Sequence, residues 1–280
     1  MNQPVLPPLR EVIARHGLGA RKELGQHFLL DANLTDRIAR AAGDLRQGTV
    51  FEIGPGPGGL TRSLLRAGAG QVVAIERDAR CIAALHELGE AFAGRLQVVE
   101  GDALRAELAP LGPAPRKIVA NLPYNISTAL LLHWLERVDD FAAFTLMFQK
   151  EVADRLMAPP GSKDYGRLSV IAQFHCTVRK LFDIAPSAFV PPPKVVSTVV
   201  ELMPRADRPR DIDPIQLSRV TAAAFGQRRK MLRAALRSLT PDSEALLQAA
   251  GIDPTMRAEQ LSLERFCALT RAWREISSRG

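Results

Sequence analysis

Between residues 49 and 148, short apolar runs rich in β-branched residues alternate with amphipathic stretches. The apolar runs lie at 49–53, 71–76, 96–100, 117–121 and 144–148. Between the first four runs, apolar residues recur at three- and four-residue spacing, which is typical of helices that bury one face. A strand–helix–strand rhythm implies right-handed crossover connections. The pattern therefore predicts an α/β fold built on a mostly parallel, doubly wound sheet.

The organisation changes after this region. Two further strand candidates, 174–184 and 195–203, have no clear helix between them, so we expect them to form a final antiparallel pair. A polar, proline-rich linker follows Met203, and the remainder is helical in pattern. The segment 240–244 has proline and acidic residues, which is typical of a helix start. We predict a catalytic domain at 1–205 and a small α-helical domain at 206–280.

Composition excludes several classes of protein. Hydrophobic residues make up 46% of the 280 residues and charged residues 24%, which is typical of a globular protein. No apolar run approaches the roughly 20 residues that span a bilayer, and prolines interrupt the N-terminus where a signal peptide would need an apolar stretch. The cysteines and histidines are too dispersed for a disulfide framework or a zinc site. We expect a cytoplasmic, metal-free monomer with no membrane partner.

Charge is unevenly distributed along the chain. Residues 205–280 contain 14 basic and 9 acidic residues, and residues 1–22 contain four basic residues and one acidic residue, whereas the middle is nearly neutral. Basic ends around a neutral body suit a partner whose phosphates are bound at the periphery. The alternative interpretation is an ordinary solvated surface.

A glycine-rich loop follows the first predicted strand. Gly54, Gly56 and Gly59 satisfy the spacing G-x-G-x-x-G, which allows a sharp turn and close approach of the backbone to a ligand. Glu76 ends the second strand, where a carboxylate could accept hydrogen bonds from ribose hydroxyls. This arrangement suits NAD and S-adenosylmethionine equally, because both carry an adenosine, and a purely structural turn is a further alternative.

Two more polar residues follow predicted strands. Asp102 comes after the third strand, where its carboxylate could accept from the amino group of a cofactor adenine, and Asn121 closes the fourth strand. Ligands of open α/β sheets bind beyond the carboxyl ends of the strands. Four consecutive strand ends with polar or glycine residues therefore predict one binding site.

The tetrapeptide Asn121-Leu122-Pro123-Tyr124 suits chemistry on an exocyclic adenine nitrogen, whose lone pair is delocalised into the ring. The Asn121 side-chain oxygen and the Leu122 carbonyl could accept hydrogen bonds from the two N–H groups of this nitrogen. These bonds would direct the nitrogen lone pair at a methyl donor. Pro123 fixes the turn. Tyr124 offers a stacking face for an extruded base. Phe189, in a proline-stiffened loop, is our candidate for the opposing wall. Ordinary packing is the alternative for either aromatic ring.

These segments together resemble the bacterial 16S ribosomal RNA adenine dimethyltransferases over nearly the whole chain. The resemblance is carried by RKELGQHFL (21–29), FEIGPGPGGLT, IERD, GDA, NLPYNIS, FQKEVADRL, YGRLSV (165–170), FVPPPKVVS (189–197) and AFGQRRKMLRAAL (224–236). It implies a Rossmann-like class I methyltransferase sheet. It also implies S-adenosylmethionine as cofactor and N6,N6-dimethylation of two adjacent adenosines near the 3′ end of 16S rRNA, linked to biogenesis of the small ribosomal subunit.

The resemblance also implies roles for individual residues. The family's cofactor contacts fall on His27, Leu29, Gly54, Glu76, Asp102 and Asn121, with Gly56 in the same glycine loop. His27 is a departure, since many members of the family have asparagine there. The implied rRNA contacts come from both basic ends of the chain: Arg21, Lys22, Arg228, Arg229, Lys230 and Arg233. A helix over 224–236 would place several of these cations on one face.

Three other functions remain as alternatives. A nicotinamide oxidoreductase could use the same glycine loop, but it explains neither 121–124 nor the basic ends. A ribosome-assembly factor could bind immature small subunits with catalysis incidental. A related enzyme could methylate adenine in large-subunit rRNA, although the segments at 165–170 and 224–230 favour the small-subunit type.

Overall fold

The computed structural model describes residues 4–20 and 26–278. The chain divides into two compact units. The first comprises Met1–Ala153 and Arg179–Pro204, and the second comprises Asp154–Val178 and Arg205–Gly280. The second unit therefore contains the predicted helical domain together with a segment from the middle of the chain.

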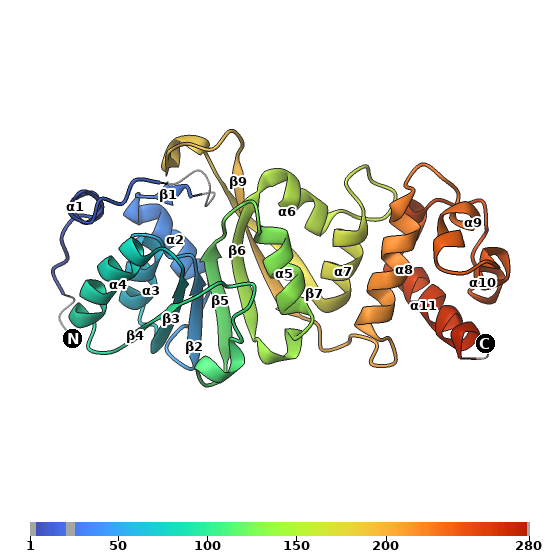
Figure 1. Cartoon of the computed structure of the whole chain (residues 1–280), viewed down its shortest axis with the longest axis horizontal. Coiled ribbons are helices and arrows are strands. Elements are labelled where there is room, and N and C mark those ends of the chain that lie inside the picture. The colour runs from blue at the N-terminus through green and yellow to red at the C-terminus, as the bar shows by residue number, and fades with distance from the viewer. Residues whose placement is uncertain (1–3, 21–25, 279–280) are drawn as a thin grey trace. The chain divides into compact units, whose positions relative to one another are not determined.

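A seven-stranded sheet forms the centre of the fold (Figure 1). Its strand order is β4-β3-β2-β5-β6-β9-β7. The strands are β2 (Thr49–Ile53), β3 (Gln71–Glu76), β4 (Leu96–Glu100), β5 (Arg116–Asn121), β6 (Ala143–Gln149), β7 (Cys176–Ile184) and β9 (Ser197–Pro204). The first three have the bounds expected from their apolar runs. β2 and β3 are buried along nearly their whole length, whereas β4, at the edge of the sheet, is buried only at Leu96.

Strand direction confirms a mostly parallel sheet with antiparallel pairing late in the chain. β2 pairs in parallel with β3 and β5, and β3–β4 and β5–β6 are parallel as well. β9 pairs antiparallel with β6. The chain leaves β2 toward β3 and β4, then returns to the other side of β2 at β5. Such a reversal opens a crevice at the carboxyl ends of the two central strands.

Helices of the first unit cover the sheet and supply its core. They are α2 (Ala32–Ala41), α3 (Gly59–Arg66), α4 (Ala79–Ala91) and α5 (Ser127–Leu135), and α6 (Lys150–Met157) begins in this unit. Asp31 and Asp78 cap α2 and α4 by accepting a hydrogen bond from the backbone N–H two residues later. The apolar face of α3 is buried at Leu60, Leu64 and Leu65, within a core cluster that includes residues of β2 and β3.

The sequence pattern did not reveal a two-stranded sheet near the N-terminus. Here β1 (Phe28–Leu29) pairs antiparallel with β8 (Phe189–Val190), so that Leu29 lies opposite Phe189. Two-residue strands are too short to produce a detectable alternation of apolar and polar residues. Helix α1 (Leu9–Arg15) precedes them in the chain.

The second unit is helical. It contains α7 (Arg167–His175), α8 (Pro214–Gly226), α9 (Leu232–Ala235), α10 (Ser243–Ala249) and α11 (Leu263–Ser277). Helix α7 packs against α8 and α11, and the buried Tyr165 hydroxyl donates to the Leu261 carbonyl at 2.9 Å. The segment 154–178 thus shares the core of the later helices.

The proposed single helix over 224–236 is wrong. Helix α8 ends at Gly226, residues 227–230 form a turn, and a separate helix begins at Leu232. Glycine and a non-helical Gln227 end α8, because glycine carries the largest entropic cost of helix formation apart from proline. Arg228, Arg229 and Lys230 therefore lie in a turn between two helices.

Three further observations concern the described residues. All three cysteines are buried, and none of them forms a disulfide bond within the described residues. Across 4–20 and 26–278, no helix combines the length and the apolar character needed to cross a membrane. In the same part of the chain, no group of three or more acidic, histidine or cysteine side chains is arranged to hold a metal ion.

Candidate functional site

A pocket lies at the carboxyl ends of the parallel strands, where the strand order reverses. The structure brings into it most of the residues that the sequence selected. These are His27, Leu29, Gly54, Gly56, Glu76, Asp102, Asn121, Leu122, Pro123 and Tyr124. The convergence confirms that four strand ends meet at one site.

The glycine loop forms one wall of the pocket. Gly56 has a φ of +55°, which is accessible to glycine and strained for other residues. A Cβ atom there would also lie 3.0 Å from the Phe28 ring. At Gly59, which starts α3, a Cβ atom would lie 2.9 Å from the Leu29 backbone oxygen. The glycines thus allow the chain at 28–29 to pack directly on the loop.

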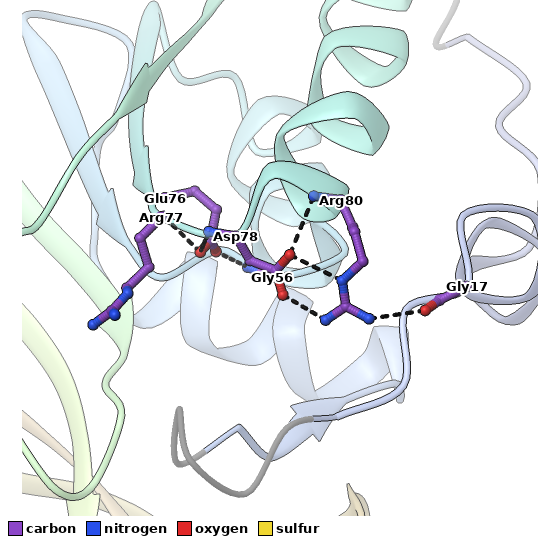
Figure 2. Close-up of polar contacts among 6 residues, drawn as sticks. All are labelled: Gly17, Gly56, Glu76, Arg77, Asp78 and Arg80. Atoms are coloured by element: carbon purple, nitrogen blue, oxygen red, sulfur yellow. Dashed lines mark hydrogen bonds and ion pairs between the residues drawn. The ribbon is translucent and has the colours of Figure 1, made fainter.

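Glu76 holds this loop in place. Its buried carboxylate accepts from the backbone N–H of Gly56 at 3.0 Å, and from those of Arg77 at 2.8 Å and Asp78 at 2.9 Å (Figure 2). A carboxylate has about four lone-pair sites, so one remains for a ligand. Glu76 therefore shapes the glycine loop and can still accept one hydrogen bond from a ribose hydroxyl.

Asp102 stands across the pocket, just after β4. It is exposed, and its carboxylate accepts from the Leu104 backbone N–H at 3.0 Å in a local turn. The turn holds the aspartate beside Gly101 and Ala103, which also line the pocket. The remaining carboxylate oxygen is available to an amino group.

Asn121 has an orientation that suits an acceptor role. Its side-chain nitrogen donates to the His27 carbonyl at 3.2 Å. No hydrogen bond within the described residues engages its side-chain oxygen, which belongs to a residue that lines the pocket. The contact with His27 fixes which end of the amide carries the oxygen. Asn121 can therefore accept a hydrogen bond from an amino group in the pocket.

Tyr124 and His27 form a fixed aromatic pair. Their rings stack with centroids 5.4 Å apart. The Tyr124 hydroxyl lies 2.5 Å from the Ser197 hydroxyl, and burial raises the pKa of the phenol above its usual value. His27 Nδ1 donates to the Pro191 carbonyl at 2.7 Å, so the other ring nitrogen is left for a ligand. The pair ties the segment at 27 and the proline-rich loop to the end of β5.

Phe189 is placed differently from the other predicted residues. Its side chain is buried, with 2% exposed, inside the apolar core cluster that also contains Leu29. It does not line the pocket. Strand pairing of β8 with β1 directs the ring into the core. The ring would have to leave this packing to contact a base, so its role as opposing wall stays a prediction.

Glu52 is a pocket residue that the sequence interpretation missed. It is the last residue but one of β2, is 2% exposed, and its Oε2 atom has no hydrogen-bond partner among the described residues. Burial, with a smaller contribution from Glu76, raises the pKa of Glu52 to about 8. An acidic residue inside a largely apolar strand run was the available signal, because acidic side chains are rarely buried without a role.

The predicted RNA-contacting residues lie elsewhere in the chain. Arg21 and Lys22 are outside the described residues. In the second unit, Arg228 forms an ion pair with Glu259 at 3.0 Å and also donates to the Lys163 carbonyl. Arg229 and Lys230 are exposed, and Arg233 lies 4.0 Å from Glu244. Arg228 thus stabilises the turn through its side chain, whereas the side chains of Arg229 and Lys230 are exposed.

Comparisons with known proteins agree over nearly the whole length. The profile of the family described as ribosomal RNA adenine dimethylase matches residues 17–274. Ribosomal RNA small subunit methyltransferase A from Paramagnetospirillum magneticum is 65% identical over 267 residues, which cover 95% of each chain.

Two crystal structures share the fold. A dimethyladenosine transferase from Plasmodium falciparum is 28% identical with a TM-score of 0.77, and the match covers 90% of this chain and 98% of that one. The 23S rRNA methyltransferase ErmE is 26% identical with a TM-score of 0.65, covering 88% and 99%. The Rossmann-like class I methyltransferase sheet is thereby confirmed. The chain belongs to the ribosomal RNA adenine dimethylase family.

Proposed function

We propose that this protein uses S-adenosylmethionine to dimethylate the N6 atoms of two adjacent adenosines near the 3′ end of 16S rRNA. The observation that carries the proposal is the meeting of two sets of residues in one pocket. Gly54, Glu76 and Asp102 form a wall suited to an adenosine-bearing cofactor, and Asn121 presents an acceptor oxygen beside them.

The pocket residues fit S-adenosylmethionine. Glu76 keeps one acceptor site for a ribose hydroxyl, and Asp102 can accept from the adenine amino group. The free ring nitrogen of His27 and the unpartnered Oε2 of Glu52 add polar contacts. When bound, the cofactor supplies a sulfonium methyl group, which is already a strong methyl donor. The protein is left with binding and positioning.

At the acceptor, the chain arranges hydrogen bonds that favour reaction. Asn121 Oδ1 and the Leu122 carbonyl accept from the two N–H groups of the adenine N6 atom, and this favours a pyramidal nitrogen with a directed lone pair. Pro123 holds the turn, and the Tyr124 ring, fixed by Ser197, supports the base by stacking. The proton leaves to solvent after methyl transfer, since the mechanism requires no general base.

Phe189 would complete the base-binding site from the other side. This role requires the ring to exchange its place in the core cluster for contact with the extruded base. Exposure of a phenylalanine side chain costs about 1.5–3 kcal/mol, which stacking on a base can offset. The exchange would restrict the second wall to the RNA-bound state.

The substrate is the small ribosomal subunit. Support comes from the 65% identical relative, whose name specifies the small subunit, whereas the 23S rRNA methyltransferase is only 26% identical. Exposed Arg229 and Lys230 supply phosphate contacts from the second unit, with Arg233 nearby in sequence. Cytoplasmic localisation and a monomeric state accompany this proposal.

The decisive experiment uses small subunits that lack the modification. Purified protein is incubated with these subunits and labelled S-adenosylmethionine, and modified nucleotides are mapped by mass spectrometry of 16S rRNA fragments. We expect two adjacent N6,N6-dimethyladenosines near the 3′ end. Label in 23S rRNA from large subunits, treated in parallel, would instead support the large-subunit alternative. Tight subunit binding without any label transfer would support a purely assembly-related function.

A further inference from the structure

Residues 7–18, which we call the N-terminal clasp, are tied to two helices of the first unit at both ends. Arg62 of α3 donates from Nη1 to the Pro7 carbonyl at 2.6 Å. Arg80 of α4 donates from Nη1 to the Gly17 carbonyl at 3.0 Å. Both helices begin directly after a wall of the pocket, because α3 follows the glycine loop and α4 follows Glu76 by three residues.

Apolar packing reinforces the two ties. Val12 and Leu18 of the clasp are buried in a separate cluster with Cys81 and Ala84 of α4. A Cβ atom on Gly59 would lie 3.1 Å from the Leu9 side chain, so the clasp also packs on the first residue of α3. The clasp is therefore a packed part of the first unit.

Arg62 is an unusual tether. It is buried, with 8% exposed, and no ion pair with a carboxylate is found for it among the described residues. Burial lowers the pKa of its guanidinium, and Arg66 lowers it further. A buried cation without an acidic partner is costly unless it is hydrogen-bonded. The Pro7 carbonyl supplies such a bond, so the position of the clasp and the burial of Arg62 depend on each other.

The second tie leads directly to the glycine loop (Figure 2). The Arg80 guanidinium contacts the Asp78 carboxylate at 2.6 Å, and the Asp78 backbone N–H donates to Glu76 at 2.9 Å. Glu76 in turn accepts from the Gly56 N–H. A continuous chain of polar contacts thus joins the Gly17 carbonyl to the loop that lines the pocket.

The chain beyond the clasp forms a further wall of the pocket. Gln26, His27, Phe28 and Leu29 line the pocket, and Phe28 packs on Gly56. Gly59 links this wall to the clasp, because a Cβ atom there would lie 3.1 Å from the Leu9 side chain and 2.9 Å from the Leu29 backbone oxygen. The clasp and the wall therefore pack on the same residue, the first of α3.

We propose that Arg62 and Arg80 are positioning residues that hold the N-terminal clasp and thereby preorganise the wall at 26–29 for the cofactor. Holding a segment in its bound conformation increases affinity, because less conformational entropy is lost on binding. Neither arginine lines the pocket. The inference rests on the proposed function only in taking S-adenosylmethionine as the ligand.

A matched control exists within the same unit. Arg46 contacts Asp44 with the same local geometry as Arg80 and Asp78: its backbone N–H and Nε donate to Oδ1, and Nη2 donates to Oδ2. The Arg46 side chain is 78% exposed and forms no hydrogen bond or ion pair with residues 7–18. Arg46→Ala therefore removes the same kind of local pair without releasing the clasp.

The test compares Arg80→Ala with Arg46→Ala in the full chain. Affinity for S-adenosylmethionine is measured by calorimetry, and hydrogen exchange is followed in peptides covering 7–18. For Arg80→Ala we expect affinity to fall about five- to tenfold and exchange in the clasp to accelerate. Arg46→Ala should match the wild type in both. Wild-type affinity and wild-type exchange in Arg80→Ala would overturn the proposal.

A second variant distinguishes release of the clasp from a local structural defect in α4 caused by Arg80→Ala. Leu18→Ala weakens the same clasp from its own side, so its effect on affinity should not add to that of Arg80→Ala in the double variant. Full additivity would show that Arg80 acts independently of the clasp and would overturn the proposal. If the wild type fails to bind S-adenosylmethionine, the proposed function fails, whereas the exchange measurement still decides whether Arg80 holds the clasp.

Discussion

At the scale of single residues, Glu52 and Glu76 show how environment gives two neighbouring carboxyl groups different tasks. Glu76 accepts three backbone hydrogen bonds and thereby orders the glycine loop. Glu52 has an unpartnered oxygen, and its pKa of about 8 keeps it protonated at neutral pH. A protonated carboxyl can donate a hydrogen bond, which no carboxylate can do. The pocket therefore offers both an acceptor and a donor from the acidic residues of adjacent strands.

The raised pKa of Glu52 predicts a pH-dependent stability. Between pH 4.5, the ordinary value, and about pH 8, the folded chain holds a proton that the unfolded chain releases. Rising pH therefore lowers the free energy of unfolding across this window, by at most about 1.4 kcal/mol per pH unit. Glu52→Gln, which stays neutral, should show a flatter profile. Urea unfolding of both proteins from pH 5 to 8.5 measures the difference, and parallel profiles would contradict the expectation.

Asn121→Ala should largely abolish methyl transfer. The substitution removes the amide oxygen that the mechanism assigns to the adenine amino group, and loss of one preorganised hydrogen bond at a reacting centre typically costs about 10²–10³ in rate. Single-turnover transfer to small subunits measures the effect. Because Asn121 also contacts the His27 carbonyl, affinity for S-adenosylmethionine is measured in parallel. A rate within threefold of wild type would contradict the mechanism.

At the scale of elements, the turn between α8 and α9 concentrates the exposed cations of the second unit. Arg228 is held by Glu259 and the Lys163 carbonyl, so it stabilises the turn itself. Arg229 and Lys230 are exposed and project from the same turn. Arg229 and Lys230 are therefore the cations of this turn that could neutralise phosphates of a bound RNA.

Removal of charge at Arg229 and Lys230 should weaken subunit binding and reduce its salt dependence. If each contacts one phosphate, the double alanine variant should lower the slope of log K against log salt by roughly one to two. Arg228→Ala is the comparison, and we expect a smaller change of slope from it because Arg228 is already paired. Filter binding at several salt concentrations provides the slopes. Unchanged slopes in the double variant would favour an ordinary solvated surface.

The elements also show which features a sequence can reveal. The runs 49–53, 71–76 and 96–100 became strands with those bounds. The first two are the buried, largely apolar segments typical of central parallel strands. The sequence also predicted that the polar residues after these strands would lie together, because the carboxyl ends of parallel strands lie at one edge of the sheet. The pair β1–β8 could not be foreseen, since two residues carry no periodicity. The burial of Phe189 depends on that pair, and so the placement of the ring was missed with it.

At the scale of the whole molecule, the second unit is assembled from two separate stretches of chain. Its core joins Asp154–Val178 to the helices after Arg205. The buried bond from the Tyr165 hydroxyl to the Leu261 carbonyl links the two stretches. The predicted domain boundary at 205 follows the change of composition at the linker. Composition contains no information on long-range packing, so it did not indicate that Asp154–Val178 belongs to the second unit.

Tyr165→Phe should destabilise the second unit by about 1–2 kcal/mol, because it leaves the buried Leu261 carbonyl without its partner. Trp273 in α11 reports on this unit by fluorescence once Trp134 is replaced by phenylalanine in the background protein. Ser218→Ala, which removes an exposed bond to Arg167 between the same stretches, should change the unfolding free energy by less than about 0.5 kcal/mol. Equal effects of the two substitutions would contradict the expectation.

The two-stretch assembly has a consequence for exchanging parts between relatives. A chimaera made with one crossover near residue 205 would combine Asp154–Val178 of one parent with the C-terminal helices of the other, and mismatched side chains would meet in a shared core. Transfer of the helical unit from a donor protein requires three junctions, near residues 153, 178 and 204. Both stretches of the unit, Asp154–Val178 and Arg205–Gly280, then come from the same parent. We therefore expect recombination at a single point near residue 205 to pair two unmatched parts of one core, and few such hybrids between distant relatives to fold.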